Sequence, residues 1–312
     1  MMKFSKPYFW DKKYSIMSIL FIPIAIFIQF LFFIKKKITK EEVFSVPIIC
    51  IGNIYIGGTG KTPLAIKMDA IFKKLEKNPV IIRKFYDSHK DEVELIKGKS
   101  KNLIVESKRK EAINKAIKKG FDLMILDDGF QDHSIKKNLN ILCFNSNQLV
   151  GNGMTIPSGP LRESFKSIKN SKIIIINGNR NEEFEKKIKE ISSDISIYYT
   201  GYLPKNVKKL KNLKLLAFAG IGNPKNFFKF LSNYKLQVEK TISFPDHYEY
   251  TEKDIKKLFN LAKKNNLRLV TTEKDFFRLK YLNLSNNITY LPVELNIIEE
   301  EKLSQELKKY IK

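Results

Sequence analysis

The chain has 312 residues, of which 43% are hydrophobic and 12% aromatic, so its composition excludes an intrinsically disordered protein and its length suits one large α/β unit or two smaller lobes. Its 57 Lys and Arg residues outnumber 33 Asp and Glu residues and give a net charge of +24, which attracts polyanions such as nucleic acids, anionic lipids or phosphorylated sugars. Because the lysines are spread along almost every amphipathic segment and no RNP-type, zinc-finger or basic-zipper pattern occurs, we expect no nucleic-acid partner.

A long apolar run lies near the N-terminus, from Ile16 to Ile34. Only Ser18, Pro23 and Gln29 interrupt it, and three lysines at 35–37 follow it. About 20 apolar residues suffice to span a bilayer, but lysines on both sides leave the positive-inside comparison nearly even. No small-residue cleavage site follows, so a secretory signal is not indicated. We expect a helix embedded in the inner leaflet, with one full crossing as the alternative.

The first strand candidate, Val46 to Ile51, runs into a glycine-rich loop that reads GNIYIGGTGKTP from Gly52 to Pro63. In a Walker A loop, successive backbone N–H groups surround phosphate oxygens, Lys61 reaches the β and γ phosphates, and the Thr62 hydroxyl ligates Mg²⁺. The loop consists of Tyr55, Ile56, Gly57, Gly58, Thr59, Gly60, Lys61 and Thr62, with Tyr55 where the usual motif has its first glycine. This loop predicts binding of ATP with Mg²⁺.

Short apolar runs then alternate with helical patterns. The further strand candidates are 80–82, 103–105, 123–126, 141–144 and 173–176, and residues 111–119 form one of the intervening helical patterns. This βαβ repetition predicts an α/β fold of the P-loop NTPase type with a doubly wound, mostly parallel sheet. Cys50 lies in an apolar run, which indicates a buried small hydrophobe and not a reactive thiol.

A pair of aspartates, Asp127 and Asp128, follows the apolar strand 123–126. This is the position of a Walker B acid, whose carboxylate holds Mg²⁺ directly or through water. Gln131, three residues further on, is placed to orient a nucleophile or to sense the nucleotide. The alternative interpretation of the pair is a turn or a helix cap.

Two further clusters, the Asp91-Glu92 pair and the FPDHY segment, are weak signals unless each has a partner elsewhere in the chain. Asp91 and Glu92 open a short helical pattern, where an acidic pair usually only complements the helix dipole. His247 lies in the segment FPDHY, and Arg162, in SGPLRE, is the side chain suited to gripping a phosphate. The segment TTEKD at 271–275 is typical of a capped helix start.

The basic stretch 205–214 indicates a linker to a second α/β lobe. The expected strands of this lobe are 215–219, 237–244 and 268–271, and its expected helices are 225–231 and 252–264. We therefore predict a membrane-associated helix in 1–40, a P-loop core in 41–205, and a smaller lobe in 206–312 that closes over the active site.

Taken in order, these segments resemble those of the tetraacyldisaccharide 4'-kinases, the lipid A 4'-kinases of Gram-negative bacteria. The N-terminal apolar helix, GNIYIGGTGKTP, the Asp-Glu pair, DDGFQ, SGPLRE, FPDHY and TTEKD follow one another in the family's order, over essentially the whole chain. The sequence departs from the family at residues 82–86, where IRKFY replaces SRGYG, and the segment before the Asp-Glu pair is shorter.

The resemblance implies ATP-dependent phosphorylation of the 4'-hydroxyl of a tetraacyl glucosamine disaccharide 1-phosphate. It places the enzyme at the cytoplasmic face of the bacterial inner membrane, anchored by the N-terminal helix. The implied partners are this lipid-linked substrate and the membrane surface, and we expect no obligate protein partner. A lipid hydroxyl cannot leave the bilayer cheaply, since each exposed CH₂ costs about 0.8 kcal/mol.

The resemblance also implies roles for individual residues. Asp91 would be the base that accepts the hydroxyl proton, and His247 would pair with it across the two lobes. Glu92 would join the two Walker B aspartates around Mg²⁺, while Arg109 and Arg162 would meet phosphates of nucleotide or substrate. The alternatives are a membrane-bound P-loop switch or partitioning ATPase without a lipid acceptor, and a basic nucleic-acid-binding ATPase.

Overall fold

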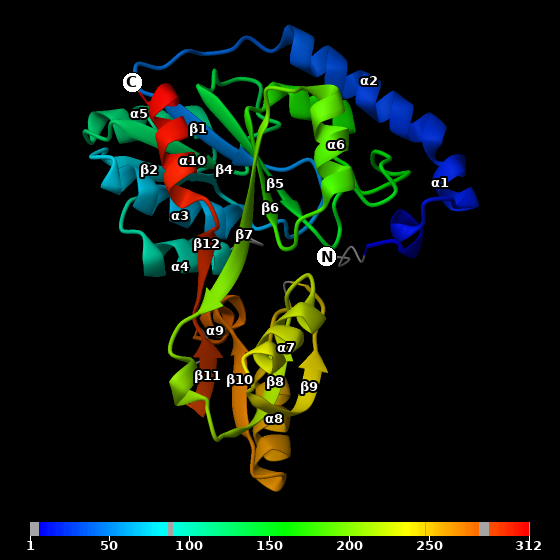
Figure 1. Ribbon diagram of the computed structural model, residues 1–312, viewed down its shortest axis with the longest axis vertical. Helices are drawn as coiled ribbons and strands as arrows, with labels where there is room; N and C mark the ends of the chain where they lie inside the picture. Colours follow the sequence, from blue (N-terminus) through cyan, green and yellow to red (C-terminus); the bar gives the residue numbers. More distant parts are fainter. Residues whose placement is uncertain (1–5, 87–89, 247, 281–286, 312) are drawn as a thin grey trace. The chain divides into compact units, whose positions relative to one another are not determined.

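The computed structural model describes residues 6–86, 90–246, 248–280 and 287–311, and it divides into two compact units (Figure 1). Unit 1 comprises Met1–Lys84, Asn102–Gly201 and Asn296–Lys312, and unit 2 comprises Phe85–Lys101 and Tyr202–Leu295. Compared with the predicted ranges 1–40, 41–205 and 206–312, the N-terminal residues belong to unit 1, residues 85–101 belong to unit 2, unit 2 resumes at Tyr202, and the segment from Asn296 belongs to unit 1.

Unit 1 is built around a sheet that has eight strands in the described part of the chain, in the order β12-β7-β6-β5-β1-β4-β2-β3. The strands are β1 (Ile48–Gly52), β2 (Pro79–Lys84), β3 (Leu103–Glu106), β4 (Leu123–Asp127), β5 (Leu139–Asn145), β6 (Ile173–Asn177), β7 (Ser196–Pro204) and β12 (Val293–Ile297). Every pairing from β3 to β7 is parallel. The predicted α/β fold with a mostly parallel sheet is confirmed.

The central strands are buried along their whole length, which explains their continuous apolar sequence. All five residues of β1 and of β4 are buried, as expected for parallel strands covered on both faces. The helices of unit 1 that follow β1 are α3 (Lys61–Lys74), α5 (Arg109–Lys118), α6 (Glu182–Ile191) and α10 (Glu300–Leu307), with 3₁₀ turns η3 (Phe165–Asn170) and η6 (Lys308–Tyr310). Cys50 lies inside β1 and is buried, as predicted, and this burial raises its pKa to about 11.

Unit 2 has its own parallel sheet, with the order β11-β10-β8-β9 in the described residues. Its strands are β8 (Lys214–Ala219), β9 (Gln237–Ser243), β10 (Arg268–Thr272) and β11 (Ile288–Leu291). Its helices are α4 (Lys90–Lys99), α7 (Pro224–Asn233), α8 (Glu252–Lys264) and α9 (Glu273–Lys280), with the 3₁₀ turn η4 (Val207–Lys209). The second α/β lobe is therefore present, and it includes α4 from the first third of the chain.

The N-terminal apolar run does not form the single helix that we predict from its sequence. After the 3₁₀ turn η1 (Tyr8–Asp11), the run is divided into α1 (Ile16–Leu20) and α2 (Ile22–Ile38). The break falls at Phe21, just before Pro23, which lacks the N–H that a continuing helix needs. Within the described residues, no helix combines the length and the apolar character that crossing a membrane requires.

Three residues of the N-terminal segment attach it to the rest of unit 1. The indole N–H of the buried Trp10 donates to the Pro157 carbonyl at 2.9 Å. The Ser18 hydroxyl accepts a hydrogen bond from Asn152 Nδ2 at 3.1 Å. Gln29 Nε2 donates to the backbone carbonyl of Arg162 at 3.2 Å. The polar interruptions Ser18 and Gln29 thus mark the side of the run that faces protein.

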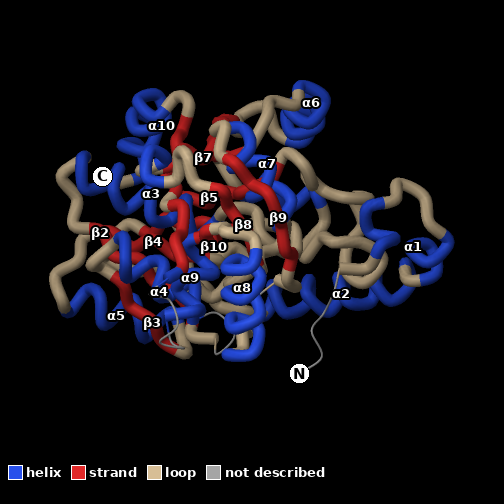
Figure 2. Tube along the Cα trace, turned by 90° about the horizontal axis from the view of Figure 1, so that it is seen from below, coloured by secondary structure: helices blue, strands red, loops and turns tan. Residues whose placement is uncertain are grey.

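Helices α1 and α2 lie at the margin of unit 1 (Figures 1 and 2). Away from the attached positions, most of their side chains are apolar and exposed, so they form a wide apolar surface. We call it the N-terminal apolar face. Its side chains are 40% to 84% exposed and comprise Ile16, Met17, Ile19, Leu20, Ile24, Ile26, Phe27, Phe30, Leu31, Phe32, Phe33, Ile34 and Ile38. Monomeric soluble proteins rarely expose an apolar patch of this extent without a binding role.

Candidate active site

The glycine-rich loop connects the end of β1 to the first turn of α3. Gly60 stands at the N-cap of α3 with a φ of 94°, a left-handed conformation that favours glycine. The side chain of Asn53 fixes the loop from inside, because its Nδ2 donates to the Tyr55 carbonyl at 2.7 Å and to the Thr59 hydroxyl at 2.9 Å. This strand, loop and helix N-terminus form the arrangement that binds phosphate.

Tyr55, which replaces the usual first glycine, is explained by a neighbouring segment. The Tyr55 side chain is buried, and the Tyr55 backbone forms an isolated antiparallel bridge with the backbone of Leu161. On either side of this bridge, Ile56 N donates to the Pro160 carbonyl at 2.9 Å and Arg162 N donates to the Ile54 carbonyl at 2.7 Å. The SGPLRE segment therefore holds the start of the loop in an extended conformation, in which a side chain is accommodated.

Strand β4 delivers the two predicted Walker B aspartates beside the loop. The Thr62 hydroxyl donates to Asp127 Oδ2 at 3.0 Å, so two oxygen ligands lie together at the N-terminus of α3. Arg83, at the end of the adjacent strand β2, forms a buried ion pair with Asp127 and also donates to the Thr62 hydroxyl at 3.2 Å. Sequence reasoning missed Arg83, although its position at the end of a parallel strand is a signal for this edge of the sheet.

The Asp128 carboxylate is surrounded by basic groups. Its Oδ1 lies 3.7 Å from the Lys61 ammonium and 3.0 Å from Nη1 of Arg162. Burial on its own raises the pKa of Asp128, but the charges of Lys61 and Arg162 outweigh it and hold this pKa below its ordinary value. The carboxylate therefore stays ionised at neutral pH and keeps both cations at the mouth of the loop.

Arg109 and Gln131 belong to the same cluster. Arg109 Nη2 donates to the Asp128 carbonyl at 2.6 Å, and its Nη1 lies 3.2 Å from Asp132 Oδ2. Gln131 Nε2 donates to the Asn53 carbonyl at 2.9 Å, directly before the loop. The sites predicted in unit 1 are thus gathered at the carboxyl ends of β1 and β4, the edge at which open α/β sheets bind ligands.

The residues beside the loop fit a Mg²⁺ ion shared with a nucleotide. Mg²⁺ in kinases and ATPases is held by one or two protein oxygens, with phosphates and water completing the octahedron. The adjacent oxygens of Thr62 and Asp127 supply that number. Among the described residues, no group of three or more acidic, His or Cys side chains forms a metal site by itself. Such an ion would neutralise charge on the transferred phosphate.

The Asp-Glu pair lies in unit 2, on α4, and not in the predicted P-loop core. The side chain of Asp91 is 3% exposed and forms an ion pair with Arg278 at 2.6 Å, while Glu92 pairs with Lys274 at 3.0 Å. These ion pairs join α4 to α9, and the two helices pack together. His247 lies outside the described residues, so its pairing with Asp91 stays a prediction.

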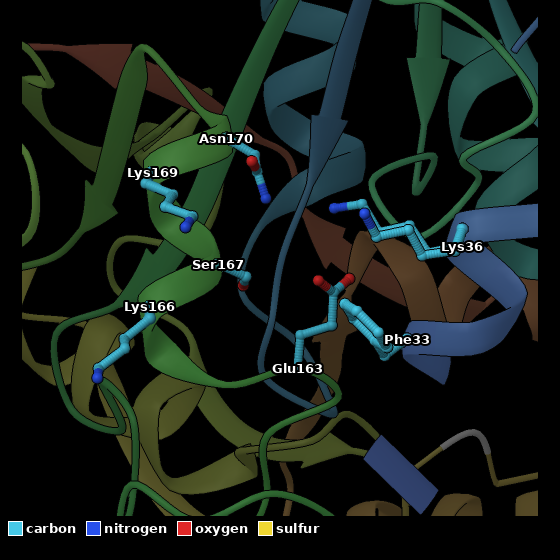
Figure 3. A pocket seen from close by; sticks show the side chains of 8 residues that line it. Phe33, Lys36, Glu163, Lys166, Ser167, Lys169 and Asn170 are labelled. Atoms are coloured by element: carbon cyan, nitrogen blue, oxygen red, sulfur yellow. The ribbon is translucent and has the colours of Figure 1, made fainter. Parts of the chain in front are cut away.

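An open cavity of about 500 Å³ lies between the C-terminal end of α2 and η3 (Figure 3). Its lining is basic and consists of Phe33, Lys36, Lys37, Glu163, Lys166, Ser167, Lys169 and Asn170. Burial raises the pKa of Glu163, although Gln131, Lys36 and Lys137 act against this rise. Glu163 lines the cavity and directly follows Arg162, whose guanidinium contacts Asp128 beside the loop. The lysines give the cavity a positive charge. Phe33, which also lines it, belongs to the N-terminal apolar face, so the cavity lies at the border of that face.

A parallel α/β sheet with this loop after β1 and paired aspartates after the adjacent β4 defines a P-loop nucleotide-binding protein. The family model of the tetraacyldisaccharide-1-P 4'-kinases matches residues 15–312, and the chain belongs to that family. It is therefore an ATP-dependent kinase that transfers phosphate to a hydroxyl group.

Two relatives show how far the likeness extends. The tetraacyldisaccharide 4'-kinase of Pelagibacter ubique is 43% identical over 312 residues, which covers 98% of each chain. That of Rickettsia typhi is 31% identical over 328 residues, covering 98% of this chain and 99% of the relative. A crystal structure described as the apo form of LpxK from Aquifex aeolicus in complex with ATP has the same fold, with a TM-score of 0.75 and 23% identity over 95% of this chain and 100% of that one.

Proposed function

We propose that this kinase phosphorylates the 4'-hydroxyl of a tetraacyl glucosamine disaccharide 1-phosphate in lipid A biosynthesis, at the cytoplasmic face of the bacterial inner membrane. One observation carries the proposal. The backbone of Arg162 binds Gln29 of α2, and its guanidinium binds Asp128 beside the P-loop lysine. A single residue thus connects the helix that carries the N-terminal apolar face to the site that binds phosphate.

The substrate class follows from the chemistry next to that connection. An acylated substrate needs an apolar surface, and a sugar phosphate needs cations. The N-terminal apolar face supplies the first and the lysine-lined cavity beside α2 supplies the second. We propose that α1 and α2 lie in the headgroup region of the inner membrane, with the lysines at 35–37 near anionic headgroups.

The residue roles in unit 1 form part of this proposal. The loop from Tyr55 to Thr62 binds the phosphates of ATP, and Lys61 stabilises the charge that develops on the transferred group. Thr62, Asp127 and Asp128 provide the environment of Mg²⁺, with Glu92 as a further predicted contributor. Arg109 and Arg162 bind phosphates of nucleotide or substrate, and Gln131 orients groups at the loop.

Asp91 is proposed as the general base. It accepts the proton of the 4'-hydroxyl while the hydroxyl oxygen bonds to the γ-phosphorus and the bond to ADP breaks. The pairing of Asp91 with His247, which would tune its basicity, is proposed on the family resemblance.

The test is to incubate the protein with labelled ATP and the disaccharide 1-phosphate in detergent micelles. We expect one phosphorylated disaccharide per ATP consumed, a loss of kcat on the order of 10² for Lys61→Ala, and a severe loss for Asp91→Asn. Lys187→Ala, on the exposed surface of α6, is the control and should match the wild type. ATP hydrolysis without any phosphorylated lipid would support a P-loop switch instead and would defeat the kinase assignment to this substrate.

A further inference from the structure

The TTEKD segment has no role in the phosphate chemistry proposed above, yet two of its polar residues, Thr271 and Asp275, are fully buried. Asp275, in the first turn of α9, is fully buried. Its Oδ2 accepts hydrogen bonds from the Gly220 backbone N–H at 3.0 Å and from the Thr272 hydroxyl at 2.7 Å. Its Oδ1 accepts one from the Tyr250 hydroxyl at 3.0 Å. Asp275 is therefore fixed in a single orientation at the carboxyl ends of β8 and β10.

Arg278 lies one helical turn after Asp275 and connects it to Asp91. Its Nη1 donates to Asp275 Oδ1 at 2.9 Å and to the Gly220 carbonyl at 2.6 Å. Its Nε and Nη2 both donate to Asp91 Oδ2, at 2.9 Å and 2.6 Å. One guanidinium thus bridges a carboxylate of α9 and a carboxylate of α4.

A guanidinium suits this place and an ammonium does not, because only its planar fork donates in fixed directions to several acceptors at once. Burial lowers the pKa of Arg278, but Asp91 and Asp275 together outweigh burial and raise it, so the group stays charged. Among the described residues, the charged groups near Asp91 also include Lys274, whose Nζ lies 3.6 Å from Oδ2, and Glu92 on the same helix.

We propose that Arg278 is a positioning residue for phosphoryl transfer, which holds the carboxylate of Asp91 in one orientation while Asp275 and Gly220 hold Arg278. The inference rests on the proposed function, in which Asp91 is the base. A base must reach the hydroxyl proton in one geometry, and a displacement of about 1 Å is enough to cost about 10² in rate. Through this network, α4 is connected to the residue that follows β8 and to the first turn of α9.

The main test compares Arg278→Lys with Arg268→Lys, which makes the same exchange at an exposed site on β10. We expect Arg278→Lys to lower kcat about 10- to 100-fold with little change in the KM for ATP, because the charge remains but the two directed hydrogen bonds to Asp91 are lost. Arg268→Lys should leave both constants unchanged.

A double variant separates positioning from a merely structural effect. If Arg278 acts through Asp91, Arg278→Lys in an Asp91→Asn background should cause no further loss of kcat. Equal losses in both backgrounds would overturn the inference. If Arg278→Lys does not fold, Tyr250→Phe replaces it, since it removes one hydrogen bond to Asp275 and no charge. We expect it to lower kcat about 2- to 5-fold at an unchanged KM for ATP, and an unchanged kcat would overturn the inference.

The outcomes also distinguish this inference from the proposed function. No phosphorylated disaccharide with the wild-type protein defeats the proposed function. Activity that survives Asp91→Asn in full removes the base and the positioning role together. Activity that is lost in Asp91→Asn but fully retained in a folded Arg278→Lys overturns the role of Arg278 alone.

Discussion

Gly52 shows how closely the Walker B segment approaches the start of the P-loop. It is the last residue of β1, and a Cβ placed on it would overlap the Cβ of Phe130, which follows the paired aspartates. Without a side chain at position 52, the two loops of the site pack against each other directly. The glycine is therefore required by close approach, since its φ is not in the left-handed region.

We predict that Gly52→Ala destabilises unit 1 by about 1–3 kcal/mol, the usual cost of overpacking a buried site. The measurement is the free energy of unfolding from chemical denaturation. Gly201→Ala is the control, because no described atom lies within 4 Å of the Cβ that it would add. Equal stability of the two variants would contradict the close approach of Phe130.

Glu163 is a second residue whose environment leads to a prediction. Its folded-state pKa is raised by burial, so its contribution to stability is fully present below the unfolded value of 4.5 and is lost as the pH rises through the folded value. Glu163→Gln keeps the shape of the side chain and stays neutral. We expect this variant to melt at a higher temperature than the wild type at pH 7 and to lose this part of the pH dependence.

The measurement for Glu163→Gln is the melting temperature across pH 4 to 8. Glu111→Gln on α5 serves as the comparison, because its carboxylate is more than half exposed and should not change the profile. A lower melting temperature for Glu163→Gln at neutral pH would show that the ionised carboxylate stabilises the fold through the lysines of the cavity.

At the scale of the element, the N-terminal apolar run shows that the number of consecutive apolar residues does not by itself predict a single helix. The run is long enough to suggest one spanning helix, but the structure divides it at Phe21 and attaches α2 to unit 1 through Gln29. Residues 30 to 34 are all exposed, so the C-terminal half of α2 is exposed around its circumference. The three residues that interrupt the run correspond to these features: Ser18 and Gln29 are the attached positions, and Pro23 lies at the break between the helices.

We predict that Phe27→Ser combined with Phe30→Ser weakens binding to lipid vesicles about 100-fold or more, because each aromatic side chain contributes about 1.5 kcal/mol or more when it is buried in lipid. Co-sedimentation with vesicles measures the effect. Phe85→Ser changes an equally exposed phenylalanine in unit 2 and should leave binding intact. Unaltered binding of the double variant would place the membrane contact elsewhere on the protein.

Helix α4 gives a second lesson at this scale. Its acidic start and its short helical pattern predict the helix itself, and the structure confirms it. The unit to which it belongs is decided by the ion pairs from Asp91 and Glu92 to α9, nearly 200 positions away in the chain. A pairing over that distance leaves no periodic signal in the local sequence.

At the scale of the whole molecule, the net charge of +24 favours adsorption to an anionic surface. Lysines 35 to 37 at the end of α2 and the lysines of the cavity bring part of this charge to the border of the N-terminal apolar face. Membrane attachment should therefore combine an apolar term that is insensitive to salt with an electrostatic term that salt screens.

We predict that raising NaCl from about 0.1 M to about 0.5 M weakens binding to phosphatidylglycerol vesicles about tenfold or more, while binding to phosphatidylcholine vesicles changes little. Co-sedimentation at several salt concentrations measures both. Salt dependence of similar size on the two vesicle types would mean that the lysines do not meet the lipid headgroups.

The sequence by itself determined the features that local patterns encode. The GGTGKT loop, the paired aspartates after an apolar strand and the alternation of strands and helices each depend on neighbouring residues, so the mostly parallel α/β fold and the phosphate site follow from them. Only the tertiary structure decided which distant segments meet: Arg83 with Asp127, Tyr55 with the SGPLRE segment, and Arg278 with Asp91. The reason is physical, because these contacts satisfy buried charges and backbone groups whose partners are chosen by packing and not by spacing along the chain.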